Sequence, residues 1–206
     1  MVELTSTSLV RQVHFRIPKA YLSYRKQQQG GEHGDVYLEA LLPDLRPWSH
    51  RNLTYPFLPD IKSISTIPAK RESAEENKIY IRLNPGLNYG AERIWQEYLK
   101  EYEKVKKITS DLYIYKRKIK RHELDNSEWI APLNQEPRNT IYFKCWSLCT
   151  AYTDLQKDVS IEYYFDKKYL KQWAEIDKRV KEFSNNFVVS VFLINKNEGT
   201  INNSGY

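Results

Sequence analysis

The feature that most constrains the fold is a series of short β-type segments along the whole sequence. In residues 13–17, Val13, Phe15 and Ile17 alternate with polar side chains, so one face of an extended strand is apolar. Strand-forming segments of similar length recur at 36–42, 78–84, 111–117, 140–146, 159–165 and 188–194. They predict a largely antiparallel sheet, and the glycine-containing loop after the first segment predicts a hairpin between the first two strands.

Two longer stretches have helical spacing. The first, 91–108, has an apolar face that includes Ile94 and Tyr98. The second follows Asp166, a favourable N-cap, and its apolar residues recur at steps of three and four. These residues are Leu170, Trp173, Ile176, Val180, Phe183 and Phe187. The expected fold class is therefore α+β: a largely antiparallel sheet with two long amphipathic helices packed on it.

The chain has 206 residues, which fits one folded domain. We expect this single α+β domain to cover residues 1–195 and residues 196–206 to form a flexible tail. Each half of the chain has strands leading into one aromatic helix, so two subdomains with a boundary near 121–139 are the alternative.

Five prolines interrupt residues 43–77, so little regular structure is expected there. The apolar residues of this segment predict a long loop that is packed on the body of the protein, which is a candidate binding surface. Within it, Trp48, Tyr55 and Phe57 are the candidate anchors for a protein partner.

The net charge of +6 permits nucleic acid, anionic lipid or an acidic protein as a partner. A basic cluster that includes Lys116, Arg117, Lys118 and Lys120 lies beside two tyrosines, as in some nucleic-acid stripes. The same lysines can protect an exposed strand edge, or can dock an acidic protein. Because the remaining charges are well mixed, a protein partner is expected rather than nucleic acid.

Catalytic motifs are absent from the sequence. It contains no nucleophile elbow, phosphate-binding glycine loop or zinc-protease helix, and its four histidines are scattered singly. We therefore expect no enzymatic activity, no cofactor and no metal. An enzyme whose site is assembled from dispersed residues remains an alternative.

The only two cysteines, Cys145 and Cys149, leave two alternatives open. On one straight strand they would be about 13 Å apart, too far for a bond. A tight hairpin with residues 146–148 as its loop would bring them face to face. We favour this hairpin disulfide over two free buried thiols. The bond would indicate an oxidising compartment such as the periplasm, whereas free thiols would indicate the cytoplasm.

The N-terminal "FRIPKAYL" and "LEALLPDLRPW" precede the cysteine-containing strands, two further strands and "YFDKKYLKQWAEIDKRVKEF". Across residues 10–187 this order resembles extracytoplasmic immunity proteins encoded beside bacterial type VI secretion effectors. The resemblance implies a non-enzymatic inhibitor that neutralises a cognate toxin, and we expect it to act by covering the toxin's active site. Such proteins often carry an N-terminal signal or membrane anchor. No segment of the given sequence has either pattern, so an anchor missing from this sequence remains an alternative. The alternative function is nucleic-acid binding through residues 116–121.

Overall fold

The computed structural model describes residues 1–8, 11–42, 44–47, 77–85, 90–118, 128–133, 135, 139–155, 159–194 and 201–203. Two β-sheets dominate this part of the chain, and the protein is mainly β. Its α-helices, α2 (Ala91–Glu101) and α3 (Trp173–Asn185), have 11 and 13 residues. The expected α+β class with two long helices is therefore wrong.

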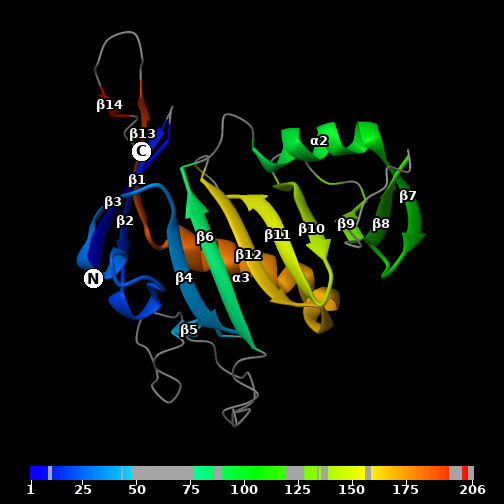
Figure 1. Cartoon of the computed structure of the whole chain (residues 1–206), viewed down its shortest axis with the longest axis horizontal. Helices are drawn as coiled ribbons and strands as arrows, with labels where there is room; N and C mark the ends of the chain where they lie inside the picture. The colour runs from blue at the N-terminus through cyan, green and yellow to red at the C-terminus, as the bar shows by residue number, and fades with distance from the viewer. Residues whose placement is uncertain are drawn as a thin grey trace.

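The smaller sheet has five strands in the order β14-β13-β2-β1-β3. Their bounds are Ile201–Asn203, Val188–Ile194, Arg11–Ile17, Val2–Thr7 and Gly31–His33. Only β1 and β3 pair in parallel. β14 lies inside the segment that the sequence suggests as a tail, and it pairs with β13. This sheet stands at one end of the molecule (Figure 1).

The larger sheet has nine antiparallel strands in the order β5-β4-β6-β12-β11-β10-β9-β8-β7. Their bounds are Arg46–Pro47, Val36–Leu41, Lys78–Asn84, Ser160–Asp166, Leu148–Asp154, Ile141–Cys145, Glu128–Pro132, Leu112–Arg117 and Tyr102–Lys107. The predicted hairpin between 13–17 and 36–42 is wrong, because β2 and β4 belong to different sheets.

The main core lies between the nine-stranded sheet, the five-stranded sheet and α3. Phe15 from the small sheet, Phe143 from the large sheet and Val180 from α3 are all completely buried in it. A short 3-10 helix, Lys167–Gln172, leads into α3, and the Asp166 carboxylate accepts a hydrogen bond from the backbone N–H of Lys168. Asp166 is thus the N-cap, but of a 3-10 turn that precedes the α-helix.

The first helix is shorter than expected because Tyr102–Lys107 forms β7 instead of further helical turns. The side chains of residues 103–107 are all exposed, so core packing favours neither conformation. Pairing with β8 supplies hydrogen-bond partners for the backbone of this segment, and this non-local interaction outweighs the weak helical preference.

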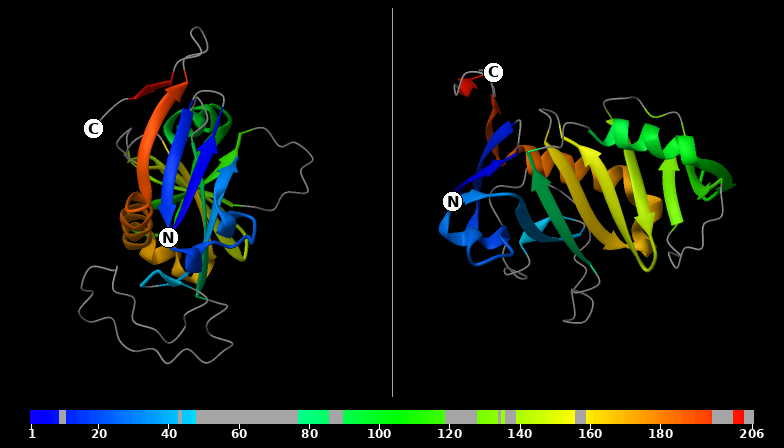
Figure 2. Two further views of the ribbon diagram at one scale, coloured as in Figure 1. Left: turned by 90° about the vertical axis from the view of Figure 1, so that its left-hand side faces the viewer. Right: turned by 45° about the horizontal axis from the view of Figure 1, so that its top comes forward.

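The two helices cover opposite faces of the nine-stranded sheet. Neighbouring residues of β10 separate the faces: Phe143 packs in the core beside α3, while Tyr142 packs beneath α2. Figures 1 and 2 show α3 along one face and α2 across only one end of the other. That second face is here called the outer face, and no helix of the described residues covers its middle.

Candidate functional site

The outer face is built from alternate residues of the central strands. Leu38, Ile81 and Tyr163 point inward and are fully or almost fully buried. Their neighbours point outward and align across the sheet in the order Tyr37, Arg82, Glu162, Tyr152, Tyr142. Successive side chains of these strands point to opposite faces of the sheet. One face is therefore part of the apolar core, and the other presents a row of polar and aromatic side chains.

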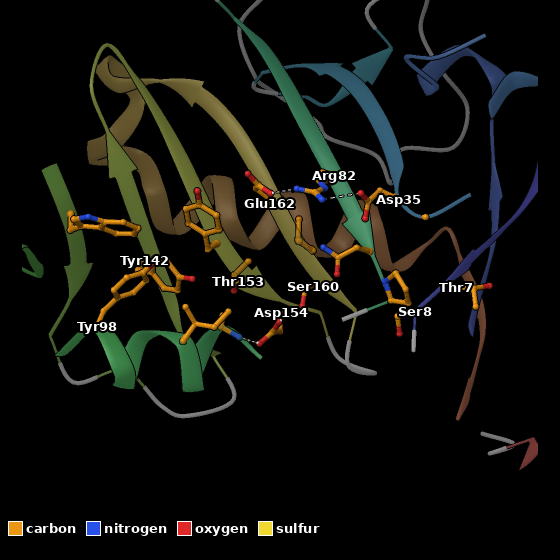
Figure 3. Close-up of a pocket in the computed structure, with 18 residues that line it drawn as sticks. Thr7, Ser8, Asp35, Arg82, Tyr98, Tyr142, Thr153, Asp154, Ser160 and Glu162 are labelled. Carbon is orange, nitrogen blue, oxygen red and sulfur yellow. Dashed lines mark hydrogen bonds and ion pairs between the residues drawn. The ribbon is translucent and has the colours of Figure 1, made fainter. Parts of the chain in front are cut away.

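An ionic network lies at the centre of this row. The Arg82 guanidinium donates to Asp35 and to Glu162, each at 2.9 Å. Partial burial opposes its charge, but the hydrogen bond and charge of Asp35, with the charge of Glu162, raise the pKa of Arg82 above its usual value. The guanidinium thus stays charged and fixed between two carboxylates (Figure 3).

Two tyrosine hydroxyls also donate hydrogen bonds to these carboxylates. Tyr37 donates its hydroxyl to Asp35 at 3.2 Å, and Tyr164 donates to Glu162. Burial, and then the neighbouring carboxylate, raise the pKa of both hydroxyls, so both remain donors at neutral pH. The network is therefore held in one arrangement by bonds between β4 with its preceding residue, β6 and β12.

An aromatic cluster fills the space between α2 and the sheet. The ring of Trp95 stacks on Tyr142 at 5.2 Å, and Tyr142 stacks on Tyr152 at 5.0 Å. Trp129 lies 4.6 Å from Tyr98 of the helix. Burial raises the pKa of Tyr152 to about 12 and that of Tyr142 further still. These rings fix the position of α2 over one end of the outer face.

Asp154 fixes the N-terminus of α2 from a distant strand. Its Oδ2 accepts a hydrogen bond from the Ala91 N–H at 2.6 Å, and its Oδ1 accepts one from Ser160 at 3.0 Å. A Cβ atom at Gly90 would lie only 2.6 Å from this carboxylate. Glycine at this position therefore allows the helix to approach the sheet closely, and the carboxylate satisfies one of the free N–H groups at its start.

Between α2, the network and the turn after β1 lies a cavity of about 480 Å³ (Figure 3). Its polar lining includes Asp35, Arg82, Asp154, Glu162 and hydroxyl groups from several strands. Its aromatic lining consists of Tyr98, Trp129, Tyr142 and Tyr152. A cavity of this size with apolar walls and a few fixed polar groups has the form of a binding site.

The cysteine hairpin borders the same face. Cys145 and Cys149 are bonded, with Cα atoms 4.1 Å apart, and they are paired in register between β10 and β11. The preferred hairpin alternative is thus confirmed. At its tip Trp146 and Leu148 are 58% and 55% exposed, while the Ser147 carbonyl accepts a bond from the Lys167 N–H. The hairpin therefore presents two apolar side chains on a doubly tethered turn.

Among the described residues, none of the predicted binding residues lines the cavity. Trp48, Tyr55, Phe57 and Lys120 lie outside the described residues. At the end of β8, Arg117 pairs with Glu101 at 2.5 Å, and Lys118 donates to carbonyls of Leu99 and Lys100. These two basic side chains thus lie at the C-terminal end of α2, which favours positive charge. Lys116 is exposed nearby.

The cavity residues were missed in the sequence because no motif marks them. The sequence does show that polar and aromatic residues occupy the alternate, outward-facing positions of the strand segments. Examples are Tyr80 and Arg82 in one segment, and Glu162 and Tyr164 in another. Among the described residues, no three His, Cys, Asp or Glu side chains are grouped as a metal site would require. No helix within the same residues has the length and apolar character to cross a membrane.

Comparison with known proteins gives one structural match to report. No protein-family model and no curated protein matches the sequence. A solved structure, an immunity protein of the Stenotrophomonas maltophilia type IV secretion system, matches with a TM-score of 0.58 and 14% identity, over 90% of this chain and 95% of that one. This neighbour gives no support to a type VI system in particular. The likeness establishes that the two chains share a fold.

Proposed function

We propose that this chain is an immunity protein, which binds a cognate secreted toxin and neutralises it without catalysing a reaction. The observation that carries the proposal is the fold shared with an immunity protein across nearly the full length of both chains. The sequence resemblance to immunity-type proteins points to the same role. The sequence resemblance is to proteins of type VI secretion systems, whereas the structural neighbour belongs to a type IV system.

The outer face is the surface we assign to the toxin. Tyrosine, tryptophan and arginine are the residues that most often carry binding energy at protein interfaces. This face offers Arg82 in its network, Tyr80 at 44% exposure and Trp146 at its border. The opposite face is occupied by the core, so a partner has access to this side of the sheet. Neutralisation would follow if the toxin's active site is covered in the complex.

The disulfide supports a periplasmic location. Bonds of this kind persist in oxidising compartments and are rare in the bacterial cytoplasm. An immunity protein in the periplasm would meet a toxin that acts on the cell envelope. A toxin that acts only in the cytoplasm would contradict this part of the proposal.

The test uses the product of the gene adjacent to this one. Its export to the periplasm of a test bacterium should stop growth, and co-export of this chain should restore growth. The purified proteins should form a stable complex. Absence of toxicity, or toxicity without rescue or complex formation, would argue against the proposed function.

A matched pair of variants tests the surface. Tyr80→Glu places a charge on the outer face and should weaken the complex at least tenfold. Ala174→Glu places the same charge on the exposed side of α3 and should leave binding unchanged. If the two effects are reversed, the toxin binds the α3 side and the outer face is not the interface.

A further inference from the structure

The cavity differs in charge from the protein as a whole. The chain has a net charge of +6, yet three carboxylates and only one guanidinium are among the described charged residues that line the cavity. These are Asp35, Asp154 and Glu162 against Arg82. The lining thus has a formal charge of −2 at neutral pH. Each terminal nitrogen of Arg82 donates to a carboxylate, so the positive charge of the guanidinium is already offset by Asp35 and Glu162.

The aromatic side chains around the cavity have polar atoms without partners. Tyr142 is only 3% exposed, and its hydroxyl forms no hydrogen bond within the described part of the chain. The same is true of the hydroxyls of Tyr98 and Tyr152 there. None of these three hydroxyls is among the solvent-inaccessible unpaired atoms of the described residues, so they are open to the cavity and available to an incoming group. A ligand that donates hydrogen bonds would supply the missing partners.

The rings themselves favour a cation. Tyr142 and Tyr152 stack at 5.0 Å, and Trp129 lies beside them, 6.4 Å from Tyr152 and 5.9 Å from Tyr142. The ring of Tyr98 lies 6.0 Å from that of Tyr142, so the three tyrosines form one group at the cavity wall. Aromatic walls with nearby carboxylates attract guanidinium and ammonium groups through ring electrostatics and charge.

We propose that the cavity receives a basic side chain, an arginine or a lysine, which the toxin inserts between the aromatic cluster and Glu162. This inference rests on the proposed function and assigns the partner's chemistry at one point of the outer face. The carboxylates supply the opposite charge, and the unpaired tyrosine hydroxyls accept N–H donors. The long apolar stem of the inserted residue lies against the rings.

The first measurement uses a small probe and needs no toxin. N-acetyl-arginine amide should bind the wild-type protein with a dissociation constant of about 1 mM, as expected for a ligand of this size. N-acetyl-glutamate amide is the probe of opposite charge and should bind at least tenfold more weakly. Calorimetry or chemical-shift titration gives both values. Equal binding of the two probes, or no saturable binding of the arginine probe, would overturn the proposal.

Two variants locate the probe. Tyr142→Phe removes a hydroxyl that has no partner in the described chain, so the fold should be retained while arginine-probe binding falls about fivefold to tenfold. Glu162→Gln removes one cavity charge and should weaken binding at least tenfold. Their controls are Tyr24→Phe and Glu39→Gln, which change the same groups outside the cavity lining. Equal effects of variants and controls would refute the site.

The toxin then separates this inference from the proposed function. If the adjacent gene product binds wild type but is insensitive to Tyr142→Phe and Glu162→Gln, the cavity inference fails and the immunity role stands. If no toxin binds wild type while the arginine probe still binds in the cavity, the immunity role fails and the site for a basic group stands. If both cavity variants lose toxin binding and both controls keep it, the result supports the immunity role and the cavity inference together.

Discussion

The disulfide allows the most direct calculation of a stability effect. Its bond closes a loop of five residues, Cys145 to Cys149, because the two are four positions apart. The chain-entropy relation gives about 2 kcal/mol for a loop of this length. Reduction keeps both sulfur atoms in the core, so it should lower the free energy of unfolding of the wild-type protein by that amount alone.

The double variant Cys145→Ala/Cys149→Ala should lose more. Both cysteines are buried, at 1% and 0% exposure, so removing each sulfur adds a loss of about 1 kcal/mol in apolar burial. The expected total is about 4 kcal/mol. Urea unfolding measures both quantities, with an unchanged dependence on urea concentration if the transition stays two-state.

The double variant is also the control for the reductant, since it has no bond to reduce. Reductant should leave its unfolding midpoint unchanged. A wild-type loss below about 0.5 kcal/mol would mean that the hairpin is equally constrained without the bond. A loss above about 4 kcal/mol would mean that the bond holds far more of the core than its own short loop. Either value would refute the reasoning from loop length.

Three further predictions concern other parts of the fold. Asp154→Ala removes the acceptor for the Ala91 N–H and should lower the free energy of unfolding by about 1 to 2 kcal/mol, measured in urea against Asp166→Ala, the corresponding change at the other cap. Phe143→Ala opens the fully buried core and should cost about 3 to 5 kcal/mol in the same assay, whereas Tyr24→Ala, on an exposed side chain, should cost less than about 1 kcal/mol. Burial raises the pKa of Tyr142 and Tyr152, so above pH 10 the folded state keeps protons that the unfolded state loses. The contribution of these tyrosines to the free energy of unfolding is complete below pH 10. Above pH 10 it should fall by about 1.4 kcal/mol per pH unit for each tyrosine, until the pKa of that tyrosine in the folded state is reached. Urea unfolding at pH 9, 10 and 11 checks the slope, and unchanged stability over this range would contradict the assigned burial.

The strand segments could be predicted from the sequence because their signal is local. Residues 13–17 and 78–84 lie in strands of the structure, and the predicted 159–165 matches β12 to within one residue at each end. The hairpin at Cys145 and Cys149 was favoured by the same local signal, although a straight strand with two free thiols was also compatible with the sequence. The alternation of apolar and polar residues, and the residues that can form a tight turn, are visible within a few consecutive positions.

The sheet order and the length of the first helix could not be predicted in this way. Tyr102–Lys107 fits either a helix or a strand, and the choice is made by β8, which lies further along the chain. The cavity depends on the same kind of information. Asp35, Arg82 and Glu162 come from three separate segments, and only the pairing of β4, β6 and β12 brings them together.

The two faces of the large sheet have different roles: one packs in the core and the other presents polar and aromatic side chains. A binding surface of this kind needs no catalytic motif in the sequence. The inner residues of β6 and β12 are bound into the core with α3, so substitutions there act on stability. The outer residues of the same strands are held in register by that core, so Arg82 and Glu162 meet without any loop having to order itself. Such pre-organisation lowers the entropy lost on binding. A partner that fits this face therefore meets fixed charges and rings, and the affinity of the complex should depend on a few of them rather than on the total area covered.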